Sequence, residues 1–464
     1  MIRIPGRQTL LPRSSPANTM KRKKAAAFIT AIVMCMSMAY SPQNYNNYSI
    51  VYAEGTETEY TPVDFDSETG TITRCWSMDD VINIPPVIDG TVVISIDSRA
   101  FGGRAMKEIY LPETITSIGS HAFSGCKNLE RIDVPYCTEN IGSMAFKDCI
   151  SLKTVNLPDN LISISDNMFT GCSSLEEIII PDKVKIIEFD AFKGCTALKN
   201  VMFPDGLECI RNSAFEGCES IEELVIPVNV FDFGYNAFEG TRWFENKRNE
   251  GTDIVINGVL LETKNDEKTI VIPDGITGIG GGALANKSRT SSICLPGSVT
   301  YICDKAFYSC TRLKTVELSD NITYIGASAF EGCHNLEETK LPEKLTTIGN
   351  RAFFNCDTIT NMTIPASVTE IGDYSIGYVS NGTRINGFTI KGYSGSAAEK
   401  YAKFTFDFIE IEGETTKGDA NCDGNVNMAD AVLIMQSLAN PDKYGVNGTD
   451  ETHITAQGKK NADC

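Results

Sequence analysis

One interval constrains this sequence more than any other feature, because a unit of 23 residues recurs along most of the chain. A phenylalanine keeps the same place in successive units: Phe123, Phe146, Phe169, Phe192, Phe215 and Phe238, then Phe307, Phe330 and Phe353. A proline keeps the same step: Pro112, Pro135, Pro158, Pro181, Pro204, Pro227, Pro273, Pro296, Pro342 and Pro365. A fixed period of this length is typical of a solenoid, whose units cannot fold alone and stack to share one core.

The unit at residues 129–151 shows what each part of the repeat is expected to form. Its first half alternates apolar and polar residues up to Pro135, which predicts a short strand with one buried face. A second short apolar run ends at Gly142, where glycine permits a tight turn, and Phe146 is expected to fill the interior. The sequence therefore predicts a β-rich solenoid of parallel strands that lie about 4.8 Å apart.

The cysteines follow the same period. Of the 16 in the chain, eight lie three residues after a repeat phenylalanine: Cys126, Cys149, Cys172, Cys195, Cys218, Cys310, Cys333 and Cys356. This phase predicts a column of small buried residues rather than a disulfide framework, since an unpaired cysteine behaves as a small apolar residue. No C-x-x-C pair occurs, which argues against a zinc site.

The start of the chain has the features of an export signal. Residues 1–53 hold a Lys/Arg cluster after Met20 and an apolar stretch at 25–38, so we expect translation to start at Met20 and cleavage to follow Ala39 or Ala53. The stretch is shorter than the roughly 20 residues of a membrane span. We therefore expect a secreted protein with no membrane span after the signal is removed.

The net charge narrows the choice of partners. The chain carries 41 basic and 60 acidic residues, for a formal net charge of −19. Nucleic acid is not an expected partner, because neutralising phosphates requires a basic surface.

The array is expected to carry a cap at each end and one irregular tract. We place an N-terminal cap containing Trp76 at residues 54–84, the repeats at 85–380 and a C-terminal cap at 381–411, with a strand, a helix over 396–403 and a second strand. The tract 239–266 is interpreted as a degenerate repeat that bulges out around Trp243, with Ile256 and Leu261 in phase. A short linker at 412–417 then leads to a separate module at 418–464.

That module begins with a pattern of oxygen-bearing residues. Positions 1, 3, 5, 7, 9 and 12 of the stretch 419–430 hold Asp419, Asn421, Asp423, Asn425 (through its backbone carbonyl), Asn427 and Asp430. Gly424 stands at position 6, where the chain must turn sharply. This is the ligand spacing of an EF-hand loop and predicts a Ca²⁺ site, although aspartate replaces the usual glutamate at position 12. The alternative is an Asp/Asn-rich turn.

Two resemblances follow from these motifs. The repeat, with its Leu-Pro, Ile-Gly and Ala-Phe-x-Gly-Cys signature, resembles the BspA-like class of leucine-rich repeats. The loop at 419–430, with one apolar helix after it, resembles a type I dockerin, which normally carries two such segments; a second loop would begin at Asp463, so the module looks partial. The resemblance implies Ca²⁺-dependent docking onto a cohesin module of a scaffoldin in a cellulosome. Its recognition residues would be Met428, Ala429, Met435, Gln436 and Asn440.

The repeats also predict a binding face. The residue two before each repeat proline is expected to point out of the strand. The middle five members of this series are apolar: Ile179, Met202, Val225, Val271 and Cys294. We call these five the apolar stripe. An exposed stripe of this kind often marks a binding site, here for an unknown protein or glycan ligand. The alternatives are that the tract around Trp243 covers it, or that the residues merely suit strands.

These features favour a secreted, non-catalytic binding protein that a dockerin attaches to a cellulosome for polysaccharide degradation. A cell-surface adhesin is one alternative. An accessory enzyme of the glycoside hydrolase type is another, but it would need two opposed carboxylates in a cleft, and the acidic residues of the array occupy repeated, solvated positions.

Overall fold

The structure is a computed structural model that describes residues 63–337, 339–411, 420, 428–446, 454 and 459. The predicted signal segment, the linker at 412–417 and most of the predicted calcium loop lie outside the described residues. Within them, no helix combines the length and the apolar composition that a membrane span requires.

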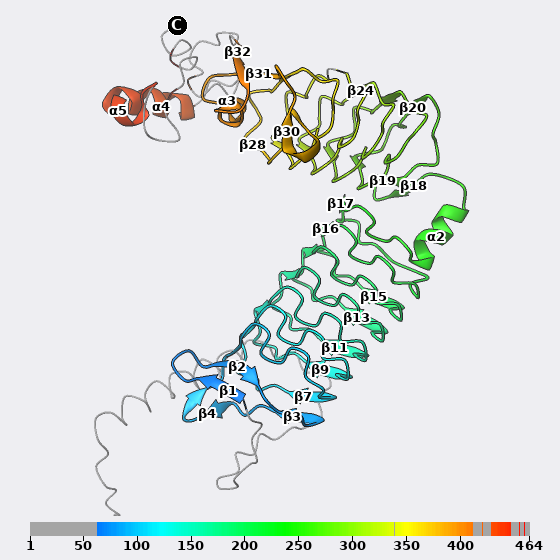
Figure 1. Ribbon diagram of the computed structural model, residues 1–464, viewed down its shortest axis with the longest axis vertical. Helices are drawn as coiled ribbons and strands as arrows, with labels where there is room; N and C mark the ends of the chain where they lie inside the picture. The colour runs from blue at the N-terminus through cyan, green and yellow to red at the C-terminus, as the bar shows by residue number, and fades with distance from the viewer. Residues whose placement is uncertain are drawn as a thin grey trace, which may run out of the picture. The chain divides into compact units, whose positions relative to one another are not determined.

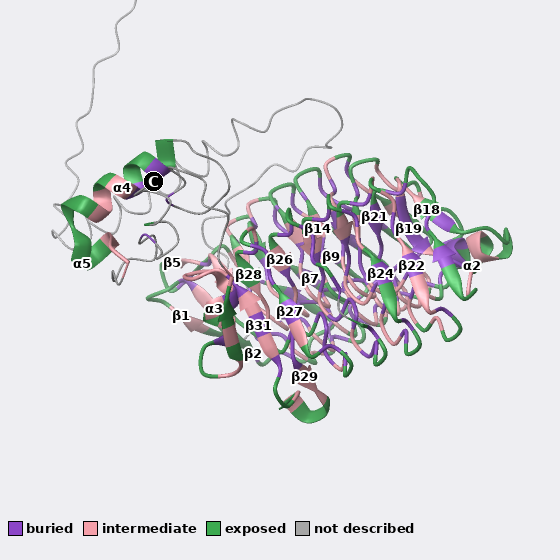
Figure 2. Ribbon diagram, turned by 90° about the horizontal axis from the view of Figure 1, so that it is seen from above, coloured by how far each residue is buried: buried purple, intermediate pink, exposed green. Residues whose placement is uncertain are grey.

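Most coils of the array contribute two short strands, and strands of the same kind stack in parallel from coil to coil (Figure 1). This confirms the predicted β-solenoid. The register advances by one repeat at each step, so that Ile132 pairs with Val155 and Ile118 with Ile141. The same positions are therefore buried in successive coils, as Figure 2 shows.

The first strands of the coils run along one side of the array. They are β3 (Val81–Asn83), β7 (Glu108–Tyr110), β9 (Arg131–Asp133) and β11 (Thr154–Asn156) in one sheet, β13 (Glu177–Ile179) and β15 (Asn200–Met202) in a second, and β20 (Thr269–Val271), β22 (Ser292–Cys294) and β24 (Thr315–Glu317) in a third. Each shows the predicted alternation, with its central residue turned inward and its outer residues toward solvent.

The second strands form a parallel series on another side. They are β6 (Ser95–Ile96), β8 (Ser117–Ile118) and β10 (Asn140–Ile141), then β12 (Ser163–Ile164), β14 (Ile186–Ile187), β16 (Cys209–Ile210) and β17 (Asp232–Phe233), and finally β21 (Gly278–Ile279), β23 (Tyr301–Ile302), β25 (Tyr324–Ile325), β26 (Thr347–Ile348) and β28 (Glu370–Ile371). Gly142, just after β10, was expected to permit a turn, but its φ is not positive. A Cβ there would lie 2.5 Å from the Ser120 nitrogen, so the glycine lets neighbouring coils approach.

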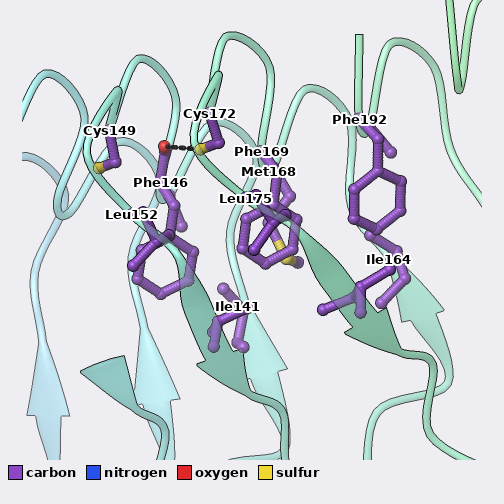
Figure 3. Close-up of a cluster of buried hydrophobic side chains, with 14 of the residues drawn as sticks. Ile141, Phe146, Cys149, Leu152, Ile164, Met168, Phe169, Cys172, Leu175 and Phe192 are labelled. Atoms are coloured by element: carbon purple, nitrogen blue, oxygen red, sulfur yellow. Dashed lines mark hydrogen bonds between the residues drawn. The ribbon is translucent and has the colours of Figure 1, made fainter. Parts of the chain in front are cut away.

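The repeat phenylalanines form two stacks inside the coils, one from Phe123 to Phe238 and one from Phe307 to Phe353; Figure 3 shows part of the first. The ring centroids of Phe146 and Phe169 are 5.4 Å apart with an interplanar angle of 7°, and those of Phe307 and Phe330 are 4.6 Å apart. Phe101 extends the first stack at its N-terminal end, 5.1 Å from Phe123. The spacing of these two residues is 22 rather than 23, which is why the periodic pattern did not include Phe101.

The eight periodic cysteines are all buried and unpaired, which confirms the prediction. Each thiol donates to the carbonyl oxygen of the core residue one coil earlier; Cys172 Sγ, for example, lies 3.1 Å from the Phe146 oxygen (Figure 3). Burial raises the pKa of Cys172 to about 12, so this thiol stays protonated at neutral pH. The column satisfies backbone carbonyls inside the turn.

The buried apolar residues form two cores in the array, and these meet in the irregular tract. The tract consists of helix α2 (Arg242–Asn249) and an antiparallel hairpin of β18 (Ile254–Ile256) and β19 (Val259–Glu262). The tract was expected to bulge out around Trp243, and α2 does project from the side of the array (Figure 1), but the Trp243 side chain itself points inward. Its ring is buried, 5.0 Å from that of Phe238 and inclined to it by 67°, so it closes the end of the first core.

The phase predicted for the tract is also corrected by the hairpin. From its phase, Ile256 was expected to be the inward-pointing residue of a second strand. In the structure it pairs with Val259 across the hairpin. The period would pair Ile256 with Ile279, but the residue that pairs with Ile279 is Leu260, four positions after Ile256. Leu261 is buried, but as the neighbour of Leu260 in β19 and not in the phenylalanine column where its phase placed it.

Both ends of the array are capped. At the N-terminal end, an antiparallel hairpin of β1 (Val63–Asp66) and β2 (Thr71–Cys75) pairs with β6, and buried Ile72 and Cys75 cover the core. Trp76 was expected to shield the first repeat, but 47% of its surface is exposed and Arg74 lies over its ring. A small hairpin of β4 (Val87–Ile88) and β5 (Thr91–Val92) follows.

At the C-terminal end, β27 (Asn361–Thr363) pairs with β31 (Thr389–Gly392), and β31 pairs with β32 (Asp407–Glu410). Helix α3 (Ala397–Ala402) lies between the last two strands in the chain, capped by Ser396, in the order expected from the sequence. A hairpin of β29 (Tyr378–Val379) and β30 (Thr383–Arg384), with the short helix η1 (Ser380–Gly382) in its turn, precedes them. Farther along the chain, the described residues form α4 (Met428–Ala439) and α5 (Pro441–Tyr444).

Candidate functional site

Four members of the apolar stripe are exposed, and the fifth is half-buried. The exposed fractions are 62% for Ile179, 54% for Met202, 88% for Val225 and 67% for Val271, while Cys294 is half-buried. Ile179 lies beside Met202 in the register of β13 and β15, and Val271 lies beside Cys294 in that of β20 and β22. The outward alternation of these strands accounts for the exposure of their residues. Val225 is exposed as well but lies outside any strand.

The five residues do not share one ladder. β13 and β15 belong to one sheet and β20, β22 and β24 to another, and the irregular tract stands between the two in the chain. Trp243 points into the first core rather than over the stripe. Trp243 therefore does not cover the apolar stripe. The stripe is divided into an N-terminal part (Ile179, Met202 and Val225) and a C-terminal part (Val271 and Cys294).

A cavity of about 540 Å³ lies where the two cores meet, between Phe238 and the coil at 281–287. Arg248 of α2 is bound there by Glu239, Glu245 and Glu262, with nitrogen–oxygen distances of 2.6 to 2.8 Å. All five guanidinium donors are used by these carboxylates, so Arg248 anchors the tract and has no donor left for a ligand.

The predicted recognition residues of the C-terminal module lie on α4 or next to it. Met428 and Met435 expose 76% and 61% of their surfaces, and Ala429 and Asn440 are exposed as well. Gln436 is half-buried. Val432 and Leu438 are also exposed on this helix, and the sequence reasoning did not include them.

Of the six predicted calcium ligands, only Asp430 belongs to the described residues. Its side chain lies in the first turn of α4 and is 1% exposed, an unusual degree of burial for a carboxylate. Leu433 of the same helix packs with Ala420 and Ile454 in a small core. Asp419, Asn421, Asp423, Asn425 and Asn427 lie outside the described residues, and the described part of the chain holds no cluster of three or more metal-binding side chains.

Two of the periodic cysteines are poorly suited to act as nucleophiles. Burial raises the pKa of Cys172 and of Cys356, and a protonated thiol is a weak nucleophile. His334 lies at the surface, with Nδ1 2.9 Å from a carboxylate oxygen of Asp357.

Comparison with known proteins agrees with this architecture. Residues 94–188, 162–248 and 260–382 match the family described as BspA type leucine rich repeat region, in six copies that together span more than half of the chain. A solved leucine-rich repeat protein of T. pallidum is 30% identical and covers 43% of this chain and 96% of its own, with a TM-score of 0.38. A leucine-rich cell surface protein of Faecalibacterium prausnitzii is 25% identical, over 75% of this chain and 97% of its own, with a TM-score of 0.38.

A further match is short. A xylanase/beta-glucanase of Ruminococcus flavefaciens is 61% identical over 49 residues, which is 11% of this chain. The matched stretch spans only 6% of that protein's length.

Proposed function

We propose that this chain, which belongs to the family of BspA-type leucine-rich repeat proteins, is a secreted, non-catalytic protein whose array binds a protein partner through the apolar stripe. The observation that carries the proposal is the exposure of Met202 beside Ile179, and of Val225 in the next repeat. Apolar side chains this exposed lower the solubility of a monomer, and a patch of them is typical of interaction surfaces.

The two parts of the stripe differ in their contribution. Ile179, Met202 and Val225 come from three consecutive repeats and are bordered by the acidic Glu177 and Glu223. An apolar centre with a charged rim is the usual anatomy of a protein interface. We therefore assign the main contact to the N-terminal part.

The test compares Met202→Asp and Val225→Asp with Ile162→Asp, a matched control on the second-strand side whose side chain is 70% exposed. A partner would first be identified by cross-linking in the extracellular fraction of the source culture and then purified. We expect each stripe variant to raise the Kd at least about tenfold, as a central interface residue does, while the control leaves it unchanged. Unchanged binding by both stripe variants, with circular dichroism showing folded protein, would refute the assignment.

We further propose that residues 418–464 form a calcium-dependent dockerin that attaches the array to a cohesin. Three observations support this second part: the ligand spacing of 419–430, the burial of Asp430 and the exposure of Met428 and Met435 on the following helix. The 49-residue match to a xylanase/beta-glucanase is shorter than a usual catalytic domain of roughly 100–200 residues, as expected if the two proteins share a small module.

Calcium binding provides the test of this second part. Titration calorimetry of the full chain should show Ca²⁺ binding that Asp430→Ala abolishes and that the control Asp442→Ala, at an exposed position on α5, leaves intact. Cohesin should be captured in Ca²⁺ and lost in chelator. Capture that persists in chelator would contradict the docking proposal without affecting the stripe.

A further inference from the structure

A second, smaller cavity lies on the second-strand side of the junction between the two cores. Its volume is about 280 Å³, and residues from both sides of the irregular tract line it. The N-terminal side contributes Arg211, Phe231 and Asp232, and the C-terminal side contributes Tyr301, Thr323 and Tyr324. Composite positions of this kind, at the boundary between two cores, are frequent places for ligand sites.

One wall of the cavity is held in place by a glycine. Gly278 lies beside Tyr301 in the register of β21 and β23, and a Cβ at position 278 would lie 2.3 Å from the Tyr301 ring. The ring occupies this space and reaches across the junction, where its hydroxyl donates to the carbonyl oxygen of Phe231. The two rings meet edge to face, 5.8 Å apart, so the aromatic wall is rigid.

The floor of the cavity is a half-buried ion pair. A terminal nitrogen of Arg211 lies 2.7 Å from Asp232 Oδ2, and the two side chains are 31% and 21% exposed. The thiols of Cys209 and Cys303 also donate to the Asp232 carboxylate, at 3.2 and 3.3 Å. Among the described residues, the Arg211 guanidinium donates to Asp232 through one of its five N–H groups. The remaining donors are available to a ligand.

The charge around this floor selects against ionic ligands. Burial raises the pKa of Asp304, and the negative charge of Asp232 raises it further. Burial and the negative charge of Asp166 likewise raise the pKa of Glu188. An anion would meet Asp232, the carboxylate that lines the cavity, and a cation would meet Arg211. A neutral ligand rich in hydroxyl groups avoids both costs and can accept from the guanidinium while donating to a carboxylate.

We propose that this cavity binds one ring of a neutral saccharide. The apolar faces of a sugar ring would lie against Phe231, Tyr301 and Tyr324, and its hydroxyls would reach Arg211 and Asp232. The volume lies just below the roughly 300–1,000 Å³ of pockets for drug-sized ligands, which suits a single ring of a longer chain. An apolar side chain from a protein partner would instead leave the Arg211 donors desolvated without an acceptor, at a cost in affinity. The site is separate from the apolar stripe and does not depend on it.

The experiment titrates the full chain with xylotetraose, cellotetraose and mannotetraose, and with tetragalacturonate as an anionic counterpart. Binding is followed by calorimetry and by ligand-observed NMR. We expect at least one neutral tetrasaccharide to bind with a Kd of about 1 mM or tighter, and tetragalacturonate to bind more weakly. No neutral binding up to about 10 mM, or tighter binding of the anion, would overturn the proposal.

Variants locate the binding. Tyr324→Ala and Arg211→Met should each raise the Kd at least about tenfold. Tyr110→Ala, which removes an exposed tyrosine outside the cavity, should leave it unchanged. If Arg211→Met fails to fold, Tyr324→Ala and Gly278→Ala, which displaces the Tyr301 ring, carry the comparison. Saccharide binding that survives substitution of Tyr324 and displacement of Tyr301 would exclude this cavity as the site.

Discussion

Replacing one ring of the phenylalanine stack tests whether the repeat units are held together by ring-to-ring contact or only by filled volume. Phe169 is fully buried, with Phe146 5.4 Å away on one side and Phe192 5.3 Å away on the other, both nearly parallel to it. Phe169→Ala should lower the free energy of unfolding by about 3–5 kcal/mol, the usual cost for a buried phenylalanine. Phe169→Leu keeps most of the apolar area and loses two aromatic contacts, so it should cost about 1–3 kcal/mol.

A double-mutant cycle isolates the contact between rings. Combining Phe169→Leu with Phe192→Leu should give a coupling energy of about 0.5–1.5 kcal/mol. Combining it with Phe330→Leu is the control, because Phe330 belongs to the other core and the two changes should be additive to within about 0.5 kcal/mol.

The assay is urea denaturation followed by the fluorescence of Trp243. This side chain is buried against Phe238 at the end of the same stack, so it reports the loss of the first core. Trp76→Phe removes the second tryptophan of the chain, whose ring is half exposed. If Phe169→Leu costs nothing and the cycle shows no coupling, the rings fill space without stabilising one another, and the reasoning is refuted.

Two further predictions test the contact between coils and a buried charge. Gly142→Ala should cost about 1–3 kcal/mol, because its Cβ would lie 2.5 Å from the Ser120 nitrogen, whereas Gly297→Ala, whose Cβ would meet nothing within 4 Å, should cost less than about 0.5 kcal/mol. Equal costs in urea denaturation would contradict the close-approach explanation. Burial raises the pKa of Asp304, so stability is lost as the pH rises through that raised pKa; Asp304→Asn should therefore raise the Tm at pH 7 and lose most of this advantage near pH 3. A gain of the same size at both pH values would show that the charge is not the cause.

Periodicity predicted the parts of the fold in which every coil repeats the same environment. Once Phe146 and Cys149 are assigned to the interior, the stacking of coils assigns their counterparts as well, and the structure confirms both columns. The exposure of Met202 followed in the same way from the alternation of a short strand. Periodicity could not show that Gly142 is needed for the close approach of two coils, because this approach is set by tertiary contacts rather than by local sequence.

The irregular tract shows where counting residues fails. The tract was interpreted as one degenerate repeat, with Ile256 and Leu261 in phase with the other repeats. However, helix α2 advances only about 1.5 Å per residue, against about 3.3 Å in a strand, and a hairpin turn follows it. The chain therefore returns to the array at Leu260, four residues later than predicted. Thr241, which caps α2 through its hydroxyl, was the one sequence signal that could have indicated the helix.

This break in the period has a chemical consequence. A regular solenoid places each side chain beside its own counterpart one repeat away, as with Ile179 and Met202, so its faces offer variations on a single strip of chemistry. At the junction, residues from distant repeats meet instead: Asn212 lies 3.4 Å from Asp304, 92 positions later, and Cys303 donates to Asp232, 71 positions earlier. Such neighbours create a combination of aromatic wall and ion pair that translation by 23 residues cannot produce. The departure from the repeat rule is therefore the place where an otherwise uniform array can acquire a specific ligand site, consistent with functional sites occurring where local sequence rules are broken.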